Sequence, residues 1–318
     1  MKNLYILQDN ARIEQQDEGL RIHTREQGEQ SIPIRMVESV MVLGHAQITT
    51  QALRLCMEHE IPVHYATRAG KLLGSCLPGQ TGMLARRMRQ YATYSDEGTR
   101  LRFASAFVHG KLAGQLNLLR RYRKRVQEYA KQEHYFLQQQ RKLDSVGSIE
   151  ELMGLEGEST RRYFANFDDI LRHTSWTGRS RMPPKDPVNA LLSLSYMLML
   201  GHIASVCTAA GFEAGVGYLH AVQSKRPSLA CDFLELYRPR IDRFVLRLFN
   251  RQEVRDEHFE ARDGGVLLRK EHFQDFMQKY DAFRPEGKEI SEYVATLHRA
   301  LKEGRPPVFV EDDLHGRL

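Results

Sequence analysis

The chain has 318 residues, and its 46 lysines and arginines against 40 aspartates and glutamates give a formal net charge of +6. This length predicts two domains, and the basic balance favours a polyanionic partner. The four cysteines lie too far apart for a paired zinc or redox motif, and the first residues turn polar too early for a secretory signal, so we expect a cytoplasmic protein.

The first 80 residues predict a β-rich domain. Short runs with strand-like alternation are separated by turn residues, and Thr50–Glu58 has the apolar spacing of a helix that covers one face of a sheet. The alternation stops after Pro78-Gly79, so we place a domain boundary between residues 80 and 81. The predicted strands are Leu4–Leu7, Gly19–Thr24, Ser31–Ile34, Val37–Leu43, Val63–Ala66 and Lys71–Ser75.

Residues 81–318 predict a larger, all-helical domain. Ser95, followed by the acidic residues Asp96 and Glu97, predicts the start of a helix whose apolar stripe runs through Leu101–Arg125, and Ser148 opens a capping box for another helix. Gly154 and Gly157 are interpreted as helix breaks that precede a further apolar helical stripe.

The most apolar stretch of the chain, Val188–Ala210, predicts a buried helix capped by Asp186. Polar side chains inside this stretch argue against a membrane span. Ser228 begins a short helix that we expect to end at Pro239, and a second helix follows. An Asp-Gly-Gly turn at residues 263–265 predicts a hairpin. The fold class is therefore α+β, with an N-terminal β-rich domain followed by a larger all-α domain.

Basic side chains are concentrated between Arg86 and Lys142, a segment that also includes Lys111 and contains four acidic residues. A phosphate-binding surface needs such a concentration of positive charge. The solvated face of an amphipathic helix would explain it equally well. The candidate DNA-binding residues are Arg86, Arg87, Arg89, Arg120, Arg121, Arg123, Lys124 and Arg125.

The remaining candidates for chemistry are acidic. The sequence has no glycine-lysine phosphate loop, no dinucleotide fingerprint and no nucleophile-elbow serine. Asp232 and Glu235 are three residues apart in the helix that begins at Ser228, so both project from one face, and His220 precedes them. Carboxylates suit Mg²⁺ or Mn²⁺, and a histidine nitrogen favours Mn²⁺. On spacing alone, a solvated acidic face and a structural histidine are the commoner explanation.

Glu156 stands between two glycines, Gly154 and Gly157. Glycines on both sides of an acidic residue permit the close approach of a ligand, but glycines also commonly end or interrupt a helix. The residues alone leave the role of this glutamate open.

Four separated blocks of the sequence together resemble one known family. They match in order and spacing the CRISPR-associated spacer-acquisition integrase/endonuclease family (Cas protein one), and the resemblance spans nearly the whole chain. The chain departs from the family pattern at Ser159-Thr160 and at Gln223–Lys225, and we expect neither departure to touch a proposed metal ligand. The four blocks are Gly154–Gly157 with Tyr163-Phe164, Pro187–Leu192 with Tyr196, Gly217–His220, and Arg226–Pro239.

The resemblance implies a catalytic site. Glu156, His220 and Glu235 would hold a divalent cation, Mg²⁺ or Mn²⁺, and Asp232 would be a nearby catalytic carboxylate that supports the ion or orients a ligand. The implied reaction joins the 3′-hydroxyl ends of a short protospacer duplex to a CRISPR repeat by transesterification, and the same site would act as an endonuclease.

The resemblance also implies partners. These are double-stranded DNA, a second copy of the chain in a homodimer, and a small ferredoxin-like CRISPR-associated subunit that bridges two dimers. No membrane partner is implied.

Two other functional classes stay open at this point. A catalytically silent architectural DNA-binding protein would use the basic helices without metal-dependent chemistry. A hydrolytic nuclease would share the metal site but use water as the nucleophile, and it would give shorter strands rather than branched, joined products. A small-molecule metalloenzyme would leave the basic segment unexplained.

Overall fold

The N-terminal strands form two sheets around one shared apolar core. The computed structural model describes residues 2–6, 8, 10–24, 28–43, 45–66, 72–76, 84–223, 226–285 and 287–309. One sheet has the strand order β1-β5-β7-β8 and the other β4-β3-β2-β6, which confirms the predicted β-rich region. The strands are β1 (Lys2–Ile6), β2 (Arg12–Gln16), β3 (Gly19–Thr24), β4 (Gly28–Pro33), β5 (Val37–Leu43), β6 (Gln47–Ile48), β7 (Val63–Ala66) and β8 (Leu72–Cys76).

Helix α1 (Thr50–Glu58) has the predicted bounds. The hydroxyl of Thr49 accepts a hydrogen bond from the backbone N–H of Ala52 at 3.2 Å and so caps the helix. Ala52 is buried in the same apolar cluster as Ile13 of β2 and Val40 of β5, so α1 and both sheets share one core. Strand β2 was not predicted, because Ile13 is its single apolar residue.

The chain divides into two compact units. One consists of Met1–Arg87 with Ala204–Phe212, and the other of Met88–Ile203 with Glu213–Leu318. The predicted domain boundary between residues 80 and 81 lies outside the described residues.

The C-terminal region is largely helical, as predicted. The predicted caps Ser148 and Asp186 each accept a hydrogen bond from the backbone N–H three residues further on, at 3.1 and 2.8 Å. The predicted helix start at Ser95 is one residue early, since Ser95 ends one helix and Asp96 caps the next by accepting from the N–H of Thr99 at 2.7 Å. The helices are α2 (Leu84–Ser95), α3 (Glu97–Arg121), α4 (Tyr129–Lys142), α5 (Ile149–Ala165), α6 (Phe167–Ile170), α7 (Pro187–Ala209), α8 (Ser228–Asn250), α9 (Lys270–Phe283) and α10 (Gly287–Glu303).

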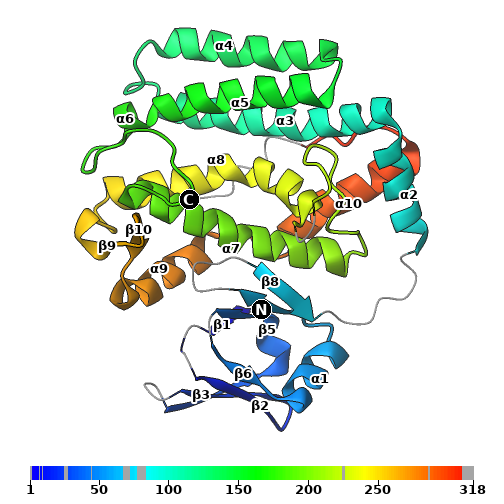
Figure 1. Cartoon of the computed structure of the whole chain (residues 1–318), viewed down its shortest axis with the longest axis vertical. Coiled ribbons are helices and arrows are strands. Elements are labelled where there is room, and N and C mark those ends of the chain that lie inside the picture. Colours follow the sequence, from blue (N-terminus) through cyan, green and yellow to red (C-terminus); the bar gives the residue numbers. More distant parts are fainter. Residues whose placement is uncertain are drawn as a thin grey trace. The chain divides into compact units, whose positions relative to one another are not determined.

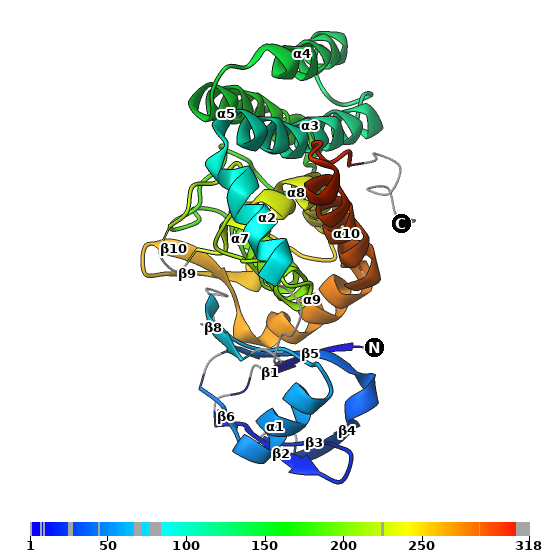
Figure 2. The ribbon, with the colours of Figure 1, turned by 90° about the vertical axis from the view of Figure 1, so that its right-hand side faces the viewer.

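Helix α3 is the central element of the larger unit. It packs against α4 and α5 on one side and against α8 on the other (Figures 1 and 2). The predicted hairpin is confirmed as β9 (Phe259–Arg262) paired antiparallel with β10 (Gly265–Leu268). Its two turn residues, Asp263 and Gly264, both have positive φ, as a tight hairpin turn requires.

Helix α7 is long and apolar enough to cross a membrane by length and composition. The core helices of globular proteins meet the same test. Most of the apolar window of α7 is buried within the structure, in agreement with the predicted buried helix.

Two glycines let α3 and α8 approach closely. A Cβ atom at Gly110 would lie 2.5 Å from the Leu236 side chain, and one at Gly114 would lie 2.9 Å from the ring of Pro239. Residue numbers rise together along the two helices at these contacts, so α3 and α8 run in the same direction. This register brings the middle of α3 beside the first half of α8.

Two predicted helix breaks are wrong. Helix α5 continues through Gly154 and Gly157, since a glycine in a helix costs only about 1 kcal/mol relative to alanine. Helix α8 continues through Pro239, where a proline ring usually clashes or breaks the helix. Buried residues on both sides of Pro239, including Tyr237 and Ile241, hold the helix in place, and Gly114 leaves room for the ring.

We expect Gly114→Val to destabilise the larger unit by about 1–3 kcal/mol, because the new side chain would push against the rigid ring of Pro239. The matched control is Gly154→Ala on α5, where an added Cβ would meet nothing and should be neutral or slightly stabilising. Urea unfolding followed by circular dichroism measures both variants. Equal midpoints for Gly114→Val and the parent chain would contradict the close approach.

Candidate active site

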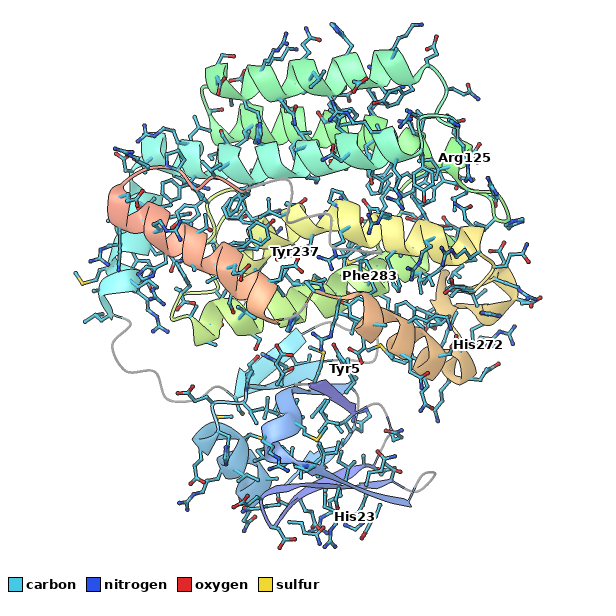
Figure 3. The ribbon with its side chains drawn as sticks, turned by 180° about the vertical axis from the view of Figure 1, so that it is seen from behind. Tyr5, His23, Arg125, Tyr237, His272 and Phe283 are labelled. Atoms are coloured by element: carbon cyan, nitrogen blue, oxygen red, sulfur yellow. The ribbon has the colours of Figure 1, made fainter. Side chains whose placement is uncertain are left out.

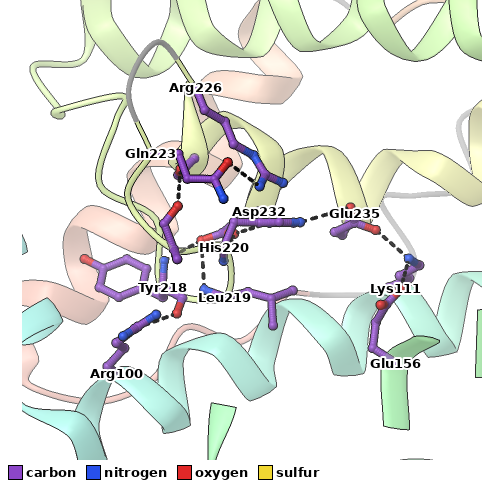
Figure 4. A network of polar contacts seen from close by, with 12 residues as sticks. Arg100, Lys111, Glu156, Tyr218, Leu219, His220, Gln223, Arg226, Asp232 and Glu235 are labelled. Carbon is purple, nitrogen blue, oxygen red and sulfur yellow. Dashed lines mark hydrogen bonds and ion pairs between the residues drawn. The ribbon is translucent and has the colours of Figure 1, made fainter. Parts of the chain in front are cut away.

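A buried lysine joins two glutamates from different helices. Lys111 of α3 donates hydrogen bonds to Glu156 of α5 and, at 2.5 Å, to Oε2 of Glu235 of α8 (Figure 4). The side chains of Lys111 and Glu235 are 3% and 4% exposed, whereas Glu156 reaches the surface with 21%. Two carboxylates from α5 and α8 therefore meet at one ammonium group.

The position of Lys111 corrects the expectation that it belongs to a basic, phosphate-facing run. It follows Phe103 and Phe107 at steps of four residues, so it occupies the buried stripe of α3 and not its solvated face. A lysine at a core position needs a buried counter-ion. That spacing is the signal by which the sequence could have identified Lys111 as part of the site.

Arg238 holds Glu235 from the other side. Its Nε lies 2.9 Å from both carboxylate oxygens of Glu235, and its guanidinium lies over the Tyr196 ring, 4.4 Å from the ring centre. Burial alone would raise the pKa of Glu235, but Arg238 and then Lys111 outweigh it and hold that pKa well below its usual range. Glu235 is therefore ionised and fixed in direction.

Asp232 is fully buried, and its oxygens are used to shape the loop before α8. One oxygen accepts the backbone N–H groups of Tyr218 and Leu219 at 2.5 and 3.2 Å, and the other accepts that of His220 at 3.0 Å. The Nδ1 atom of the His220 ring lies 2.8 Å from the same second oxygen. Because a carboxylate can only accept, Nδ1 carries the proton in this contact.

His220 therefore presents its other nitrogen to the site. Its Nε2 atom lies 4.0 Å from Oε1 of Glu235, and without a proton it has a free lone pair. A carboxylate that fixes the tautomer and direction of a histidine is a common support for a metal ligand. Asp232 is thus placed to orient His220 rather than to bind an ion itself.

Thr160 positions Glu156. Its hydroxyl donates a hydrogen bond to Oε1 of Glu156 at 2.9 Å, and Gln115 of α3 donates to the threonine oxygen at 3.3 Å. We expected the Ser159-Thr160 departure not to touch a proposed ligand, and this was wrong, since residues four apart face each other on a helix. The second departure includes residues 224 and 225, which lie outside the described residues.

A cavity of about 530 Å³ opens beside this threonine. Thr160 and Arg161 line it from α5, and Trp176 and Arg179 line it from the segment before α7. Arg181 also lines it, and Asp168 is the one carboxylate among its described lining residues, so the cavity wall carries a net positive charge and favours an anionic group.

A second buried carboxylate continues the polar network along α8. Tyr163 of α5 donates to Oδ2 of Asp242 at 2.9 Å, and Tyr196 of α7 donates to the other oxygen. Burial raises the pKa of Asp242 to about 6, although both hydroxyl groups and Arg238 act to lower it. These bonds connect α5, α7 and α8 behind Glu235.

Glu235 lies beside both other predicted ligands, but the three do not form a closed set. Lys111 bridges Glu235 to Glu156, and Oε1 of Glu235 lies 4.0 Å from Nε2 of His220. Within the described part of the chain, no group of three or more His, Cys, Asp or Glu side chains is arranged to hold an ion as it stands. The ammonium of Lys111 lies between the two glutamates instead. The donor set of two carboxylates and one imidazole nitrogen nevertheless has the chemistry that Mg²⁺ or Mn²⁺ requires.

The predicted DNA-binding residues are divided between the two compact units, and only some of them are exposed. Arg86 and Arg87 belong to the first compact unit, and the others belong to the second. Arg120 is held by Glu133 at 2.8 Å, and Arg125 donates to the backbone oxygen of Ile170 at 3.0 Å. The exposed members on the second unit are Arg89, Arg121, Arg123 and Lys124.

The sequence matches a known family model. Residues 4–282 match the model described as CRISPR associated protein Cas1. Two endonucleases from Thermus thermophilus are similar in sequence. CRISPR-associated endonuclease Cas1 3 is 32% identical over 87% of this chain and 83% of its own length, and Cas1 1 is 34% identical over 84% and 82%.

Solved structures share the fold. A Cas1 protein from Thermotoga maritima superposes with a TM-score of 0.84 at 23% identity, covering 98% of this chain and all of the other. A casposase bound to its integration product gives 0.85 at 20% identity over 100% and 96%. A Cas6-RT-Cas1–Cas2 complex gives 0.82 at 24% identity, covering 95% of this chain and 35% of the larger one.

Lys111→Met should lower the free energy of unfolding by about 3–5 kcal/mol, because it leaves Glu156 and Glu235 adjacent with less compensating charge. Lys131→Met is the control, since Lys131 forms an exposed ion pair with Glu128 and should change stability little. Thermal and urea unfolding without metal compare the two. If both variants unfold like the parent chain, Lys111 does not balance the glutamates.

Asp232→Asn should loosen the loop before α8, because an amide cannot accept from all the donors that the carboxylate now satisfies. We expect a loss of about 1–3 kcal/mol and faster hydrogen exchange at the amides of residues 218–220. Asp169→Asn, which affects one exposed acceptor for Gln127, is the control. Unchanged exchange at those amides in Asp232→Asn would show that the carboxylate does not organise the loop.

Proposed function

The chain belongs to the Cas1 family of CRISPR-associated proteins, and on that premise we propose that it is a metal-dependent DNA endonuclease and integrase of CRISPR adaptation. The observation that carries the proposal is the position of Glu235, which shares the ammonium of Lys111 with Glu156 and lies 4.0 Å from Nε2 of His220, so that three separate segments contribute. The curated relatives are described as endonucleases, which supports nucleic acid cleavage by this chain.

Glu156, His220 and Glu235 would hold the divalent cation, Mg²⁺ or Mn²⁺. When bound, the cation supplies Lewis acidity that stabilises negative charge on a phosphodiester under attack. The protein prepares its ligands in advance. Arg238 fixes the direction of Glu235, and Asp232 fixes the tautomer and direction of His220.

Lys111 balances the two glutamates before any cation binds. Its ammonium contacts both carboxylates, so a divalent ion held by the same oxygens would have to compete with it. The buried ionised pair would otherwise carry a large desolvation cost. Lys111 therefore keeps the two carboxylates together in the metal-free protein.

The reaction is a transesterification. The oxygen of a 3′-hydroxyl group attacks a phosphorus atom of the repeat, a new P–O bond forms, and the bond to the displaced 3′-oxygen breaks. The proton leaves the attacking hydroxyl, and the displaced oxygen accepts one. With water in place of the hydroxyl, the same site cleaves DNA. The shared fold of a casposase bound to its integration product supports this reaction class.

Double-stranded DNA is the proposed substrate, as protospacer and as CRISPR repeat. Exposed bases on the larger unit, including Arg121, Arg123 and Lys124, would contact backbone phosphates without reading sequence. Arg86, Arg87, Arg89, Arg120 and Arg125 remain proposed members of this DNA-binding set. We also propose a cytoplasmic homodimer and a small ferredoxin-like subunit that bridges two dimers. The Cas6-RT-Cas1–Cas2 complex, which contains the same fold, supports a partner subunit.

Glu156→Gln should reduce metal-dependent cleavage and strand joining by at least about a hundredfold, since the amide is a weak ligand for a hard cation. DNA binding without metal should be nearly unchanged. Glu158→Gln is the control, because Glu158 lies two residues away on the exposed side of α5, paired with Arg161. Labelled duplex and repeat-bearing plasmid, with and without Mn²⁺, give the products on a gel.

Each outcome of this assay separates one function from another. Branched, joined products that require Mn²⁺ and Glu156 support the integrase. Shortened strands alone would identify a hydrolytic nuclease. Full activity in Glu156→Gln, or no metal-dependent product from the parent chain, would overturn the proposed active site.

A further inference from the structure

Arginines gather around a second cavity in the larger unit. It measures about 270 Å³ and lies where the end of α3 and the segment after α6 meet the C-terminal half of α8. Figure 3 labels Arg125 in this region of the molecule. Among its described lining residues there is no carboxylate. The six arginines of this cavity, which we call the arginine pocket, are Arg121, Arg125, Arg172, Arg243, Arg247 and Arg251.

The guanidinium groups of the pocket have few hydrogen-bond partners in the described part of the chain. Nη2 of Arg243 and Nε of Arg247 are buried, and neither has a hydrogen-bond partner among the described residues. Arg251 lies 3.8 Å from Glu253, at the outer limit of an ion pair, and Arg125 donates to the neutral backbone oxygen of Ile170. Buried donors are normally satisfied, so these nitrogens indicate a ligand that accepts hydrogen bonds.

The electrostatics of the pocket favour an anion. Burial first, and then the positive charge of Arg121 and other arginines, holds the pKa of Arg243 below its usual value. Guanidinium groups remain charged in proteins, so the repulsion is relieved by a bound negative group and not by loss of a proton. The planar fork of an arginine matches two phosphate oxygens.

The pocket offers charge without a surface for a nucleobase. Its two aromatic rings already lie against arginines. The guanidinium of Arg247 is 5.7 Å from the ring centre of Phe244, and that of Arg125 is 5.7 Å from that of Tyr122. A base would have to displace one of these contacts before it could stack. The lining therefore fits backbone phosphates better than a nucleotide held through its base.

The pocket is separate from the candidate active site but lies on the same helix. Arg243 and Arg247 follow Glu235 by eight and twelve residues, which places them about 12 and 18 Å further along α8 at about 1.5 Å per residue. Helix α3 runs in the same direction and carries Arg121 ten residues after Lys111, about 15 Å along its axis. These three distances each correspond to a few base pairs of duplex.

We propose that the arginine pocket binds phosphates of the DNA backbone and anchors the DNA a short distance from the phosphate that faces Glu156 and Glu235. This inference rests on the proposed function, because it takes DNA as the substrate. The pocket adds a sequence-independent contact at a fixed distance from the reacting atoms. It thereby limits where along the strand the active site can act.

The test compares two double variants in the Glu156→Gln background without metal, so that no cleavage intervenes. Arg243→Gln with Arg247→Gln removes two pocket charges. Arg255→Gln with Arg262→Gln removes the same charge from exposed positions of the same unit. Fluorescence anisotropy measures duplex binding over a series of salt concentrations, and circular dichroism checks that each variant is folded.

We expect the pocket variant to bind duplex at least about tenfold more weakly and to lose about 1.8 from the slope of log affinity against log salt, since each phosphate contact contributes about 0.9. The control pair should change both quantities much less. Arg243→Lys with Arg247→Lys retains the charges and should restore most of the slope. Equal affinity and equal salt slope in the pocket variant and the control would overturn the proposal that the pocket binds DNA phosphates.

A second arm separates the DNA backbone from small anions. Tripolyphosphate and a nucleoside triphosphate are titrated calorimetrically into the parent chain and the pocket variant. Binding of these anions that depends on Arg243 and Arg247, with unchanged duplex affinity, would make the pocket a small-anion site and would overturn the proposal. Failure of the parent chain to bind duplex at all would instead contradict the proposed function.

Discussion

The close contact between α3 and α8 is the constraint on which the rest of the larger unit depends. Gly110 and Gly114 bring the two helix backbones together, and the parallel register places Lys111 opposite Glu235. Helix α5 packs on the same helix α3 and adds Glu156. If the two helices lay a side chain's width further apart, one ammonium could not reach both carboxylates.

The charged side chains of the site orient the proposed metal ligands more than they stabilise the fold. A buried ion pair seldom stabilises a protein more than apolar side chains of the same volume would. Here Lys111 and Arg238 hold Glu235, while Asp232 binds three backbone N–H groups and the His220 ring. The network fixes how each proposed ligand points before any ion arrives, which is the arrangement that metal-assisted catalysis requires.

Helix α8 connects the chemistry with the charge that surrounds it. Its first half carries Asp232 and Glu235, and its second half carries Arg243 and Arg247 of the arginine pocket. Pro239 between them does not interrupt the helix, so both groups are fixed on one rigid element. A substrate held at both places would be positioned by a single helix and not by independently moving loops.

The sequence by itself determined the β-rich and helical regions, the helix caps at Ser148 and Asp186, and the hairpin turn, because each depends on residues close together in the chain. Family resemblance added the proposed ligands. Only the tertiary structure decided that helix α8 passes through Pro239, that Thr160 supports Glu156, and that Lys111 lies between two glutamates 45 and 124 positions away. The spacing of Lys111 can indicate a buried charge, but local patterns cannot name its counter-ion. A proline inside a helix or a buried charge is tolerated only when a distant segment supplies the packing or the opposite charge.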